Sequence, residues 1–238
     1  MKKINLIKEL EKYPVFNLKI LREIINKDRN YAKIVIYRLK KDNLIFEIEK
    51  DKYTTLKEAI VVSSNLVWPS YMSCWTALRY YNLTEQLPKN IFVITTKSRK
   101  KRTLEFNNSQ IIFIKAKTQY FFGYNKEHYG NFDIFIAKKE KAIIDSLYFK
   151  QISLSEIYEV IKNSLNEFDS NIFIDYLIKI KNKALIKRLG FLLDLLDMDL
   201  YDKLKRHINY QYIPLDYAIS SKGKKNKKWR VIENVKLN

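Results

Sequence analysis

Residues 29–53, RNYAKIVIYRLKKDNLIFEIEKDKY, change their hydrophobic period midway, and this change restricts the fold of the N-terminal region. The apolar residues of the first half recur at helical spacing, and they are Ala32, Val35, Ile36 and Leu39. The second half alternates apolar and polar residues in LIFEIE and KYTTL, as two strands do around a short turn, here Lys50-Asp51. The stretch therefore predicts a helix from about Arg29 to Asp42, followed by a β-hairpin.

Two shorter helices are predicted before this stretch. The first has Ile4, Ile7 and Leu10 at helical spacing, and Pro14 ends it. Asn17 is a suitable N-cap for the second, whose apolar face is Leu18, Leu21, Ile24 and Ile25. Three small helices and a hairpin in this order predict a winged helix-turn-helix domain over residues 1–56.

The remaining residues, 57–238, mix predicted strands and helices. Helices are predicted over 56–66, 73–81 and 139–149, and strands over 90–96, 111–117 and 132–138. Helical spacing then dominates from Ser153 to about Ile208. We therefore expect an α/β (α+β) fold. It comprises the winged helix-turn-helix, a short helical connection near residue 56, and a mixed α/β domain with a helical C-terminal half.

The chain of 238 residues has a formal net charge of +19, and the positive charge is concentrated at its two ends. Residues 1–56 hold 14 Lys and Arg against 8 Asp and Glu, and residues 218–238 hold 7 against 1. Such a field attracts polyanions, meaning nucleic acid or an anionic membrane surface. A genome of biased composition is the alternative explanation.

The predicted third helix has an outward face suited to reading DNA. Opposite its apolar residues lie Asn30, Lys33, Ile34, Tyr37 and Lys41. A recognition helix needs one face anchored in its domain and another that presents donors to base edges in the major groove. Arg29, Arg38 and Lys40 flank that face and suit phosphates. Lys50 and Lys52 at the tip of the hairpin could reach an adjacent DNA backbone or the minor groove. The alternative is a packing module with a solvated charged face, or a winged helix that binds protein.

Two further basic segments are candidates for phosphate contacts. The segment 221–235, SKGKKNKKWRVIENV, contains Lys224, Lys225, Lys227 and Arg230. The segment 97–102, KSRKKR, is predicted in a loop between two strands. Each is either a phosphate-binding surface, which would make binding depend on salt, or a solvated and mobile charge run.

The chain offers little for enzyme chemistry, and we expect no catalytic site, metal site or cofactor. His128 and His207 are the only histidines and Cys74 the only cysteine, so no zinc set and no internal disulfide can form. Glycine-rich phosphate loops and a GxSxG elbow are absent. Asp133 with Glu140 is the nearest candidate for a metal-dependent nuclease.

The location expected from the sequence is the cytoplasm. A single cysteine fits a reducing compartment, and the N-terminal MKKINLIKELEKY lacks the apolar block of a signal peptide. The longest uncharged run, 59–78, holds serines, Asn65 and Pro69, so it predicts buried core and no membrane span.

Four segments in order resemble the AbiEi family of abortive-infection antitoxins. The first is the predicted winged helix, and the second is YMSCWTALRYYNLTEQLPKNIFVITT, 71–96. In it the matching residues are Tyr71, Ser73, Ala77, Leu78, Leu83, Thr84, Gln86, Pro88 and Thr95. EKAIIDSLY, 140–148, and KRLGFLLDLL, 187–196, are similar to two later family segments. The chain departs from the pattern at Trp75-Thr76, and at Lys50-Asp51, where the family's turn often contains glycine.

The resemblance implies an antitoxin of a type IV toxin–antitoxin system, which acts in phage defence by abortive infection. Such proteins repress their own operon by binding double-stranded DNA at inverted repeats in its promoter, with two copies expected on the DNA. A C-terminal domain counters a nucleotidyltransferase-like toxin without forming a stable complex with it. From the residues alone, a plain transcriptional regulator with a ligand- or partner-sensing C-terminal domain stays open.

Overall fold

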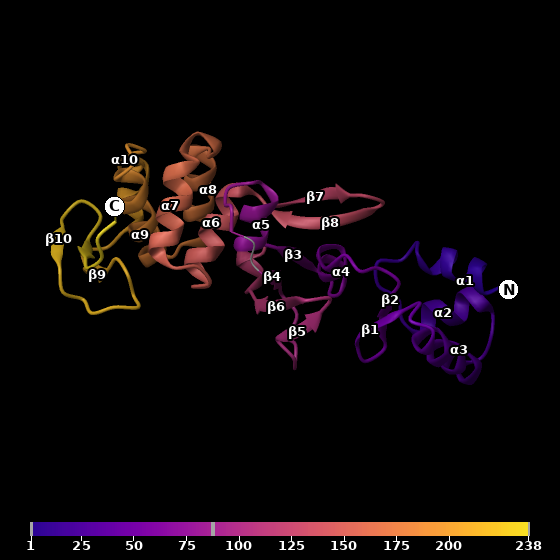
Figure 1. Ribbon diagram of the computed structural model, residues 1–238. Coiled ribbons are helices and arrows are strands. Elements are labelled where there is room, and N and C mark those ends of the chain that lie inside the picture. The colour runs from indigo at the N-terminus through magenta and orange to yellow at the C-terminus, as the bar shows by residue number, and fades with distance from the viewer. Residues whose placement is uncertain (1, 87–88, 238) are drawn as a thin grey trace. The chain divides into compact units, whose positions relative to one another are not determined.

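A computed structural model of the protein describes residues 2–86 and 89–237 (Figure 1). Pro88, one of the residues that carry the family resemblance, lies outside them. Contacts divide the chain into two compact units. Unit 1 comprises residues 1–72, 88–116 and 126–136, and unit 2 comprises 73–87, 117–125 and 137–238. The predicted boundary at residue 56 concerns where a DNA-binding domain ends, and it stays a prediction.

Unit 1 begins with three helices and a two-stranded hairpin. Their bounds are α1 Lys3–Leu10, α2 Leu18–Ile25, α3 Arg29–Lys41, β1 Phe46–Glu49 and β2 Lys52–Thr54. The Asn17 side chain accepts a hydrogen bond from the Ile20 N–H at 3.0 Å, so the predicted N-cap of α2 is confirmed. Asp28 caps α3 in the same way, with the N–H groups of Asn30 and Tyr31 as donors.

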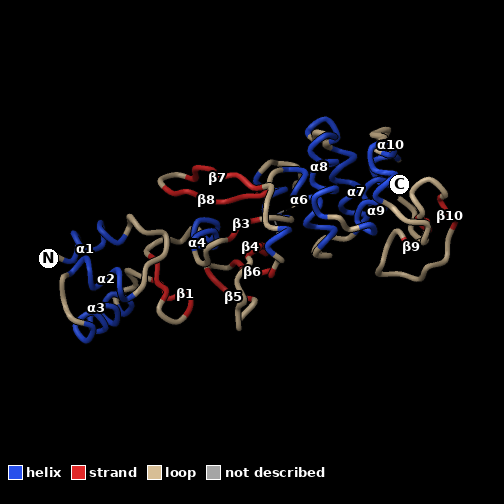
Figure 2. The backbone as a smooth tube through the Cα atoms, turned by 180° about the vertical axis from the view of Figure 1, so that it is seen from behind, coloured by secondary structure: helices blue, strands red, loops and turns tan. Residues whose placement is uncertain are grey.

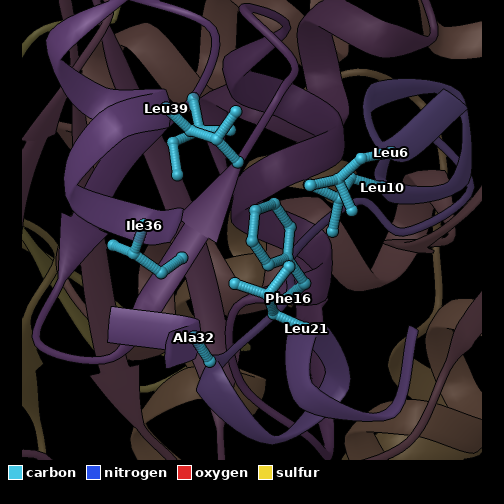
Figure 3. Packing of buried hydrophobic residues seen from close by; sticks show 8 residues of the cluster. Leu6, Leu10, Phe16, Leu21, Ala32, Ile36 and Leu39 are labelled. Carbon is cyan, nitrogen blue, oxygen red and sulfur yellow. The ribbon is translucent and has the colours of Figure 1, made fainter. Parts of the chain in front are cut away.

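One apolar core joins the three helices to the hairpin (Figure 3). Its buried residues are Leu6, Leu10, Phe16, Leu21, Ala32, Ile36, Leu39 and Ile45. Phe16 and Tyr53 exchange backbone hydrogen bonds of 2.8 Å, and their rings lie 5.9 Å apart. The Asp51 carboxylate, in the hairpin turn, accepts a hydrogen bond from the Leu18 N–H at 3.0 Å. These contacts fix the hairpin against the start of α2.

The rest of unit 1 is built on a six-stranded mixed sheet with the strand order β5-β6-β4-β3-β8-β7. The strands are β3 Ser70–Met72, β4 Asn90–Thr95, β5 Thr103–Phe106, β6 Ser109–Lys115, β7 Tyr124–Tyr129 and β8 Phe132–Ala137. β4 runs parallel to β6, with Thr95 opposite Lys115 at their carboxyl ends, whereas β5 is antiparallel to β6. The helix α4, Ala59–Asn65, packs against β3 and β4.

Helices are the main secondary structure of unit 2 (Figure 2). Its elements are α5 Trp75–Tyr80, η1 Thr118–Tyr120, α6 Lys139–Tyr148, α7 Leu154–Asn163, η2 Leu165–Glu167, α8 Ser170–Ile180, α9 Lys183–Asp194, α10 Tyr201–Leu204 and η3 Lys205–His207. α6 is the central helix, because α5, α7, α8 and α9 all pack against it. Residues 140–147 of α6 are accordingly all buried.

A small sheet closes unit 2 at the C-terminal end. Its strands are β9 Ile213–Pro214, β10 Lys224–Asn226 and β11 Val231–Glu233. β11 lies in the middle, antiparallel to β10 and parallel to β9. Trp229, between β10 and β11, is fully buried and packs against Gly190 of α9 and the ring of Tyr201.

The predicted order of N-terminal helices with a hairpin, a mixed sheet and a helical C-terminal half is confirmed. Two details differ. Residues 55–58 form no helix, because α4 begins only at Ala59. Strands β3, β5 and β7 were not predicted, and neither was the C-terminal sheet. Within the described ranges, no helix is long and apolar enough to cross a membrane.

Candidate nucleic-acid interface

The outward face of α3 carries the side chains predicted to read bases. Asn30, Lys33, Ile34, Tyr37 and Lys41 are all exposed. Ile34 keeps 48% and Tyr37 keeps 67% of its surface exposed. The opposite face, with Ala32, Ile36 and Leu39, is buried in the core. α3 is therefore anchored on one side and presents polar, basic and aromatic groups on the other.

A groove of about 500 Å³ lies between α3 and the hairpin. Four of the predicted DNA-contacting residues line it, namely Arg29, Lys33, Tyr37 and Lys50. Glu47 and Asp51 are its acidic members. Glu47 pairs with Lys40, and this hydrogen bond raises the pKa of Lys40. The fold thus brings the helix and hairpin candidates, which are separated in the sequence, onto one surface.

The basic residues of this surface differ in whether they already have a partner. In the part of the chain that the structure describes, no carboxylate pairs with Arg29, Lys33, Arg38 or Lys41. The Lys52 ammonium, in contrast, pairs with Glu49 at 2.8 Å and donates to the Leu66 carbonyl at 2.7 Å. Lys52 holds the hairpin to the segment that follows α4, so it is the least available of the predicted phosphate contacts.

The C-terminal basic segment, 221–235, contains the two strands β10 and β11. Lys224, Lys225 and Lys227 are exposed. Arg230 is half-buried and donates a hydrogen bond to the Tyr212 hydroxyl at 3.1 Å. Three lysines of this predicted set therefore remain available for an anion, while Arg230 has a structural contact. They belong to unit 2, whereas α3 belongs to unit 1.

The nearest nuclease candidates have other roles. Asp133 pairs with Lys126 at 2.6 Å and with His128 at 2.8 Å, and its pKa lies below the usual range because of these contacts, that with Lys126 first. Glu140 accepts a hydrogen bond from the Asp169 N–H at 2.9 Å. Among the described residues, no group of three His, Cys, Asp or Glu side chains could hold a metal ion.

Cys74 lies between β3 and α5 with φ +54°, a backbone shape that is uncommon for a non-glycine residue. It is fully buried, and burial raises the pKa of its thiol. A reactive cysteine needs access and a thiolate at neutral pH. Cys74 has neither, so its role is to form the turn and to fill space.

The segments that carry the family resemblance meet in buried contacts. The Ser73 hydroxyl donates to the Asp145 carboxylate at 2.8 Å, and Lys141 pairs with the other oxygen of the same carboxylate. In the last segment, Arg188 donates from Nε to the carbonyls of Pro214 and Leu215 at 3.2 and 3.0 Å. These motif residues hold elements together, and the sequence alone did not reveal these pairings.

A scan against models of known protein families gives no match for this chain, and a search of curated proteins finds no significant relative. The resemblance to AbiEi antitoxins therefore depends on the sequence segments given above.

Proposed function

We propose that the protein binds double-stranded DNA through a winged helix-turn-helix formed by α1–α3 and the hairpin β1–β2. The observation that carries this proposal is the exposed face of α3, where the basic and aromatic side chains of Arg29, Lys33 and Tyr37 line a groove shared with the hairpin. An α-helix of this kind fits the major groove, and a neighbouring hairpin reaches the adjacent backbone. The net charge of +19 supports a polyanionic partner.

A gel-shift titration at two salt concentrations tests this proposal. It compares the promoter DNA upstream of the protein's own gene with a scrambled duplex of equal length. We expect tight binding to the promoter alone, and we expect it to persist at moderate salt. Base contacts discriminate between DNA sequences, while phosphate contacts do not. Equal and strongly salt-dependent binding to both duplexes would reduce the surface to a general attraction for polyanions.

Substitutions on α3 should remove sequence discrimination. Lys33→Ala and Tyr37→Ala are each expected to weaken promoter binding by about 1–3 kcal/mol, because each removes a group placed to touch a base edge. Lys8→Ala, an exposed lysine of α1, is the matched control and should bind like wild type. Promoter affinities measured by fluorescence anisotropy decide the matter. Unchanged affinity in both α3 variants would mean that this face does not touch the bases.

Substitutions in the C-terminal basic segment should act differently. Lys224→Ala and Lys227→Ala are expected to weaken binding to promoter and scrambled DNA alike. Each should also lower the slope of log affinity against log salt by about 1, the effect of losing one phosphate contact. Affinities at four salt concentrations give the slope. A loss confined to promoter DNA would instead place these lysines at a base-reading surface.

We further propose that the protein is an antitoxin of a type IV toxin–antitoxin system that represses its own operon. Support comes from the order of the AbiEi-like segments and from their place in the fold. Ser73 of the first segment and residues of the segments 140–148 and 187–196 make buried contacts in unit 2, as a family-wide scaffold would. The expected counterpart is a nucleotidyltransferase-like toxin, which the protein would counter without a stable complex.

Co-expression tests the antitoxin proposal. A nucleotidyltransferase-like toxin encoded beside this gene should arrest growth when produced alone, and the full chain should restore growth. A chain with Lys33→Ala and Tyr37→Ala, produced from an unrelated promoter, should still restore growth, because repression is then not needed. Failure of the wild-type chain to restore growth would refute the antitoxin activity while leaving DNA binding to be judged separately.

One observation favours the rival proposal of a regulator that senses a ligand. Unit 2 contains a pocket of about 610 Å³, a size that suits a small molecule. Trp75 and Leu83 give it apolar surface, and Glu85, Glu156 and Glu159 give it acidic groups. Absence of a toxin gene beside this one, together with promoter binding, would favour the regulator.

A further inference from the structure

A small cavity in unit 1 is lined by four basic side chains. Lys97, Arg99 and Arg102 come from the loop between β4 and β5, and Lys115 comes from the end of β6. Thr95, Ser98 and Phe113 complete the lining. The cavity lies where the parallel strands β4 and β6 end, since Thr95 and Lys115 face each other there. The carboxyl ends of parallel strands are the usual edge for ligand binding in α/β sheets.

Arg99 is held in position before any ligand arrives. Its guanidinium lies 4.0 Å from the centre of the Phe113 ring, and its side chain is only 12% exposed. It donates to the Glu49 carboxylate at 2.5 Å and to the Lys101 carbonyl at 3.3 Å. Other N–H groups of the guanidinium remain for a ligand. A donor fixed in this way loses little entropy when it binds an anion.

The charges around the cavity are not balanced. Among the described residues, Glu49 is the carboxylate that pairs with a lining cation, and it is shared with Lys52. Burial raises the pKa of Glu49, but its hydrogen bonds with Lys52 and Arg99 outweigh burial and hold the pKa below the usual range. The Lys115 ammonium donates to the Ser98 hydroxyl at 2.6 Å, which brings another cation to the loop. Gathering like charges costs stability, and proteins accept such costs at functional sites.

The size of the cavity selects the ligand. Its volume is about 130 Å³, and a water molecule in the liquid takes up about 30 Å³. A tetrahedral anion fits that space, whereas a nucleoside does not. Guanidinium, ammonium and hydroxyl donors together are the groups that bind phosphate. We propose that the cavity formed by Lys97, Ser98, Arg99, Arg102 and Lys115 is a phosphate-binding site. The phosphate belongs either to a nucleic-acid backbone or to a free nucleotide or inorganic phosphate.

Isothermal titration calorimetry of the full chain with inorganic phosphate, at ionic strength held constant with chloride, tests the site without DNA. The variant Arg102→Gln/Lys115→Gln removes two lining cations and is expected to bind phosphate at least tenfold more weakly than wild type. Arg99 is left in place because it also holds Glu49. The control, Lys100→Gln/Lys101→Gln, removes equal charge from the same loop but from residues that do not line the cavity. It should bind phosphate like wild type.

Lys115→Arg keeps the charge and should retain binding, which guards against a loss caused by misfolding of the double variant. Two results would overturn the proposal: no phosphate binding by wild type beyond that of chloride, or equal losses in the cavity variant and the control.

A gel shift then identifies the source of the phosphate. Weaker binding of Arg102→Gln/Lys115→Gln to every duplex indicates the DNA backbone, and unchanged DNA binding with a heat of AMP binding indicates a free nucleotide. Because calorimetry needs no DNA, a failure of the proposed DNA binding would not obscure its result.

Discussion

Replacing Asp145 with alanine is expected to lower the free energy of unfolding by about 3–5 kcal/mol, the cost of breaking a buried ion pair. Asp145 and Lys141 of α6 are almost fully buried, and the Ser73 hydroxyl donates to the same carboxylate. Removing the carboxylate would leave the Lys141 ammonium inside unit 2 without this partner. Urea denaturation measures the change. Asp202→Ala, which breaks an exposed pair with Lys205, is the control and should change stability little.

A double variant separates the charge from the space it fills. Lys141→Met/Asp145→Leu removes both charges, and replacing a buried pair by apolar side chains of similar volume is often neutral or stabilising. We therefore expect it to recover most of the stability that Asp145→Ala loses. A double variant as unstable as Asp145→Ala would show that the contacts of these side chains, and not the unpaired charge, decide the loss.

The same double variant bears on the antitoxin proposal. Lys141 and Asp145 lie in EKAIIDSLY, one of the segments that resemble the AbiEi family. If the segment is similar because it holds α5 and α6 together, a stable double variant should still restore growth in the co-expression test. Loss of antitoxin activity in a stable, folded double variant would assign a direct role to this pair.

The elements that the sequence revealed are those whose apolar spacing is long and regular. α3 was predicted within one residue, because Ala32, Val35, Ile36 and Leu39 recur at helical spacing. β4, β6 and β8 were predicted because each contains a run of β-branched and aromatic residues. Local pattern was sufficient for these longer elements, each of which contains a regular set of apolar residues.

The missed strands lack that local signal. β3 has three residues, SYM, that are buried on both faces and have no alternation. β7, YNKEHY, has no fully buried residue and lies at the edge of the sheet, so nothing in its composition marks it as a strand. β5 alternates Leu104 and Phe106 with exposed residues over only four positions, directly after a basic loop. These segments become strands because they pair with other strands of the sheet that are distant in the sequence.

The candidate sites divide in the same way. The face of α3 follows from helical geometry, so its residues could be named in advance. The phosphate cavity could not, because Lys115 and Arg102 meet only when β6 pairs with both β4 and β5. The basic run 97–102 was its one sequence signal, and that run gave no indication that Arg99 would stack on Phe113. A run of basic residues forms a binding site only when the fold places other residues around it and so encloses a cavity.

Replacing Trp229 with alanine is expected to lower the free energy of unfolding by about 3–5 kcal/mol, as for other large buried aromatic side chains. Trp229 is fully buried, its ring lies 5.2 Å from that of Tyr201, and its backbone N–H donates to the Asn226 side chain at 2.9 Å. Trp68→Ala is the matched control, because Trp68 is 65% exposed. Trypsin should also cut the segment 221–235 faster in Trp229→Ala, since the ring fixes the loop between β10 and β11.

Gly190 tests the same contact from the facing helix. A Cβ at position 190 would lie 2.2 Å from Trp229 Cζ3, closer than any two such atoms can stand, so Gly190→Ala is expected to destabilise by about 1–3 kcal/mol. In a Trp229→Ala background the obstacle is gone. There alanine should stabilise α9 by up to about 1 kcal/mol, because glycine is a poor helix former. The substitution at 190 should therefore change sign between the two backgrounds in urea denaturation. Equal effects in both backgrounds would mean that Gly190 is not needed to make room for the Trp229 ring. The C-terminal sheet would then be held to α9 by other contacts.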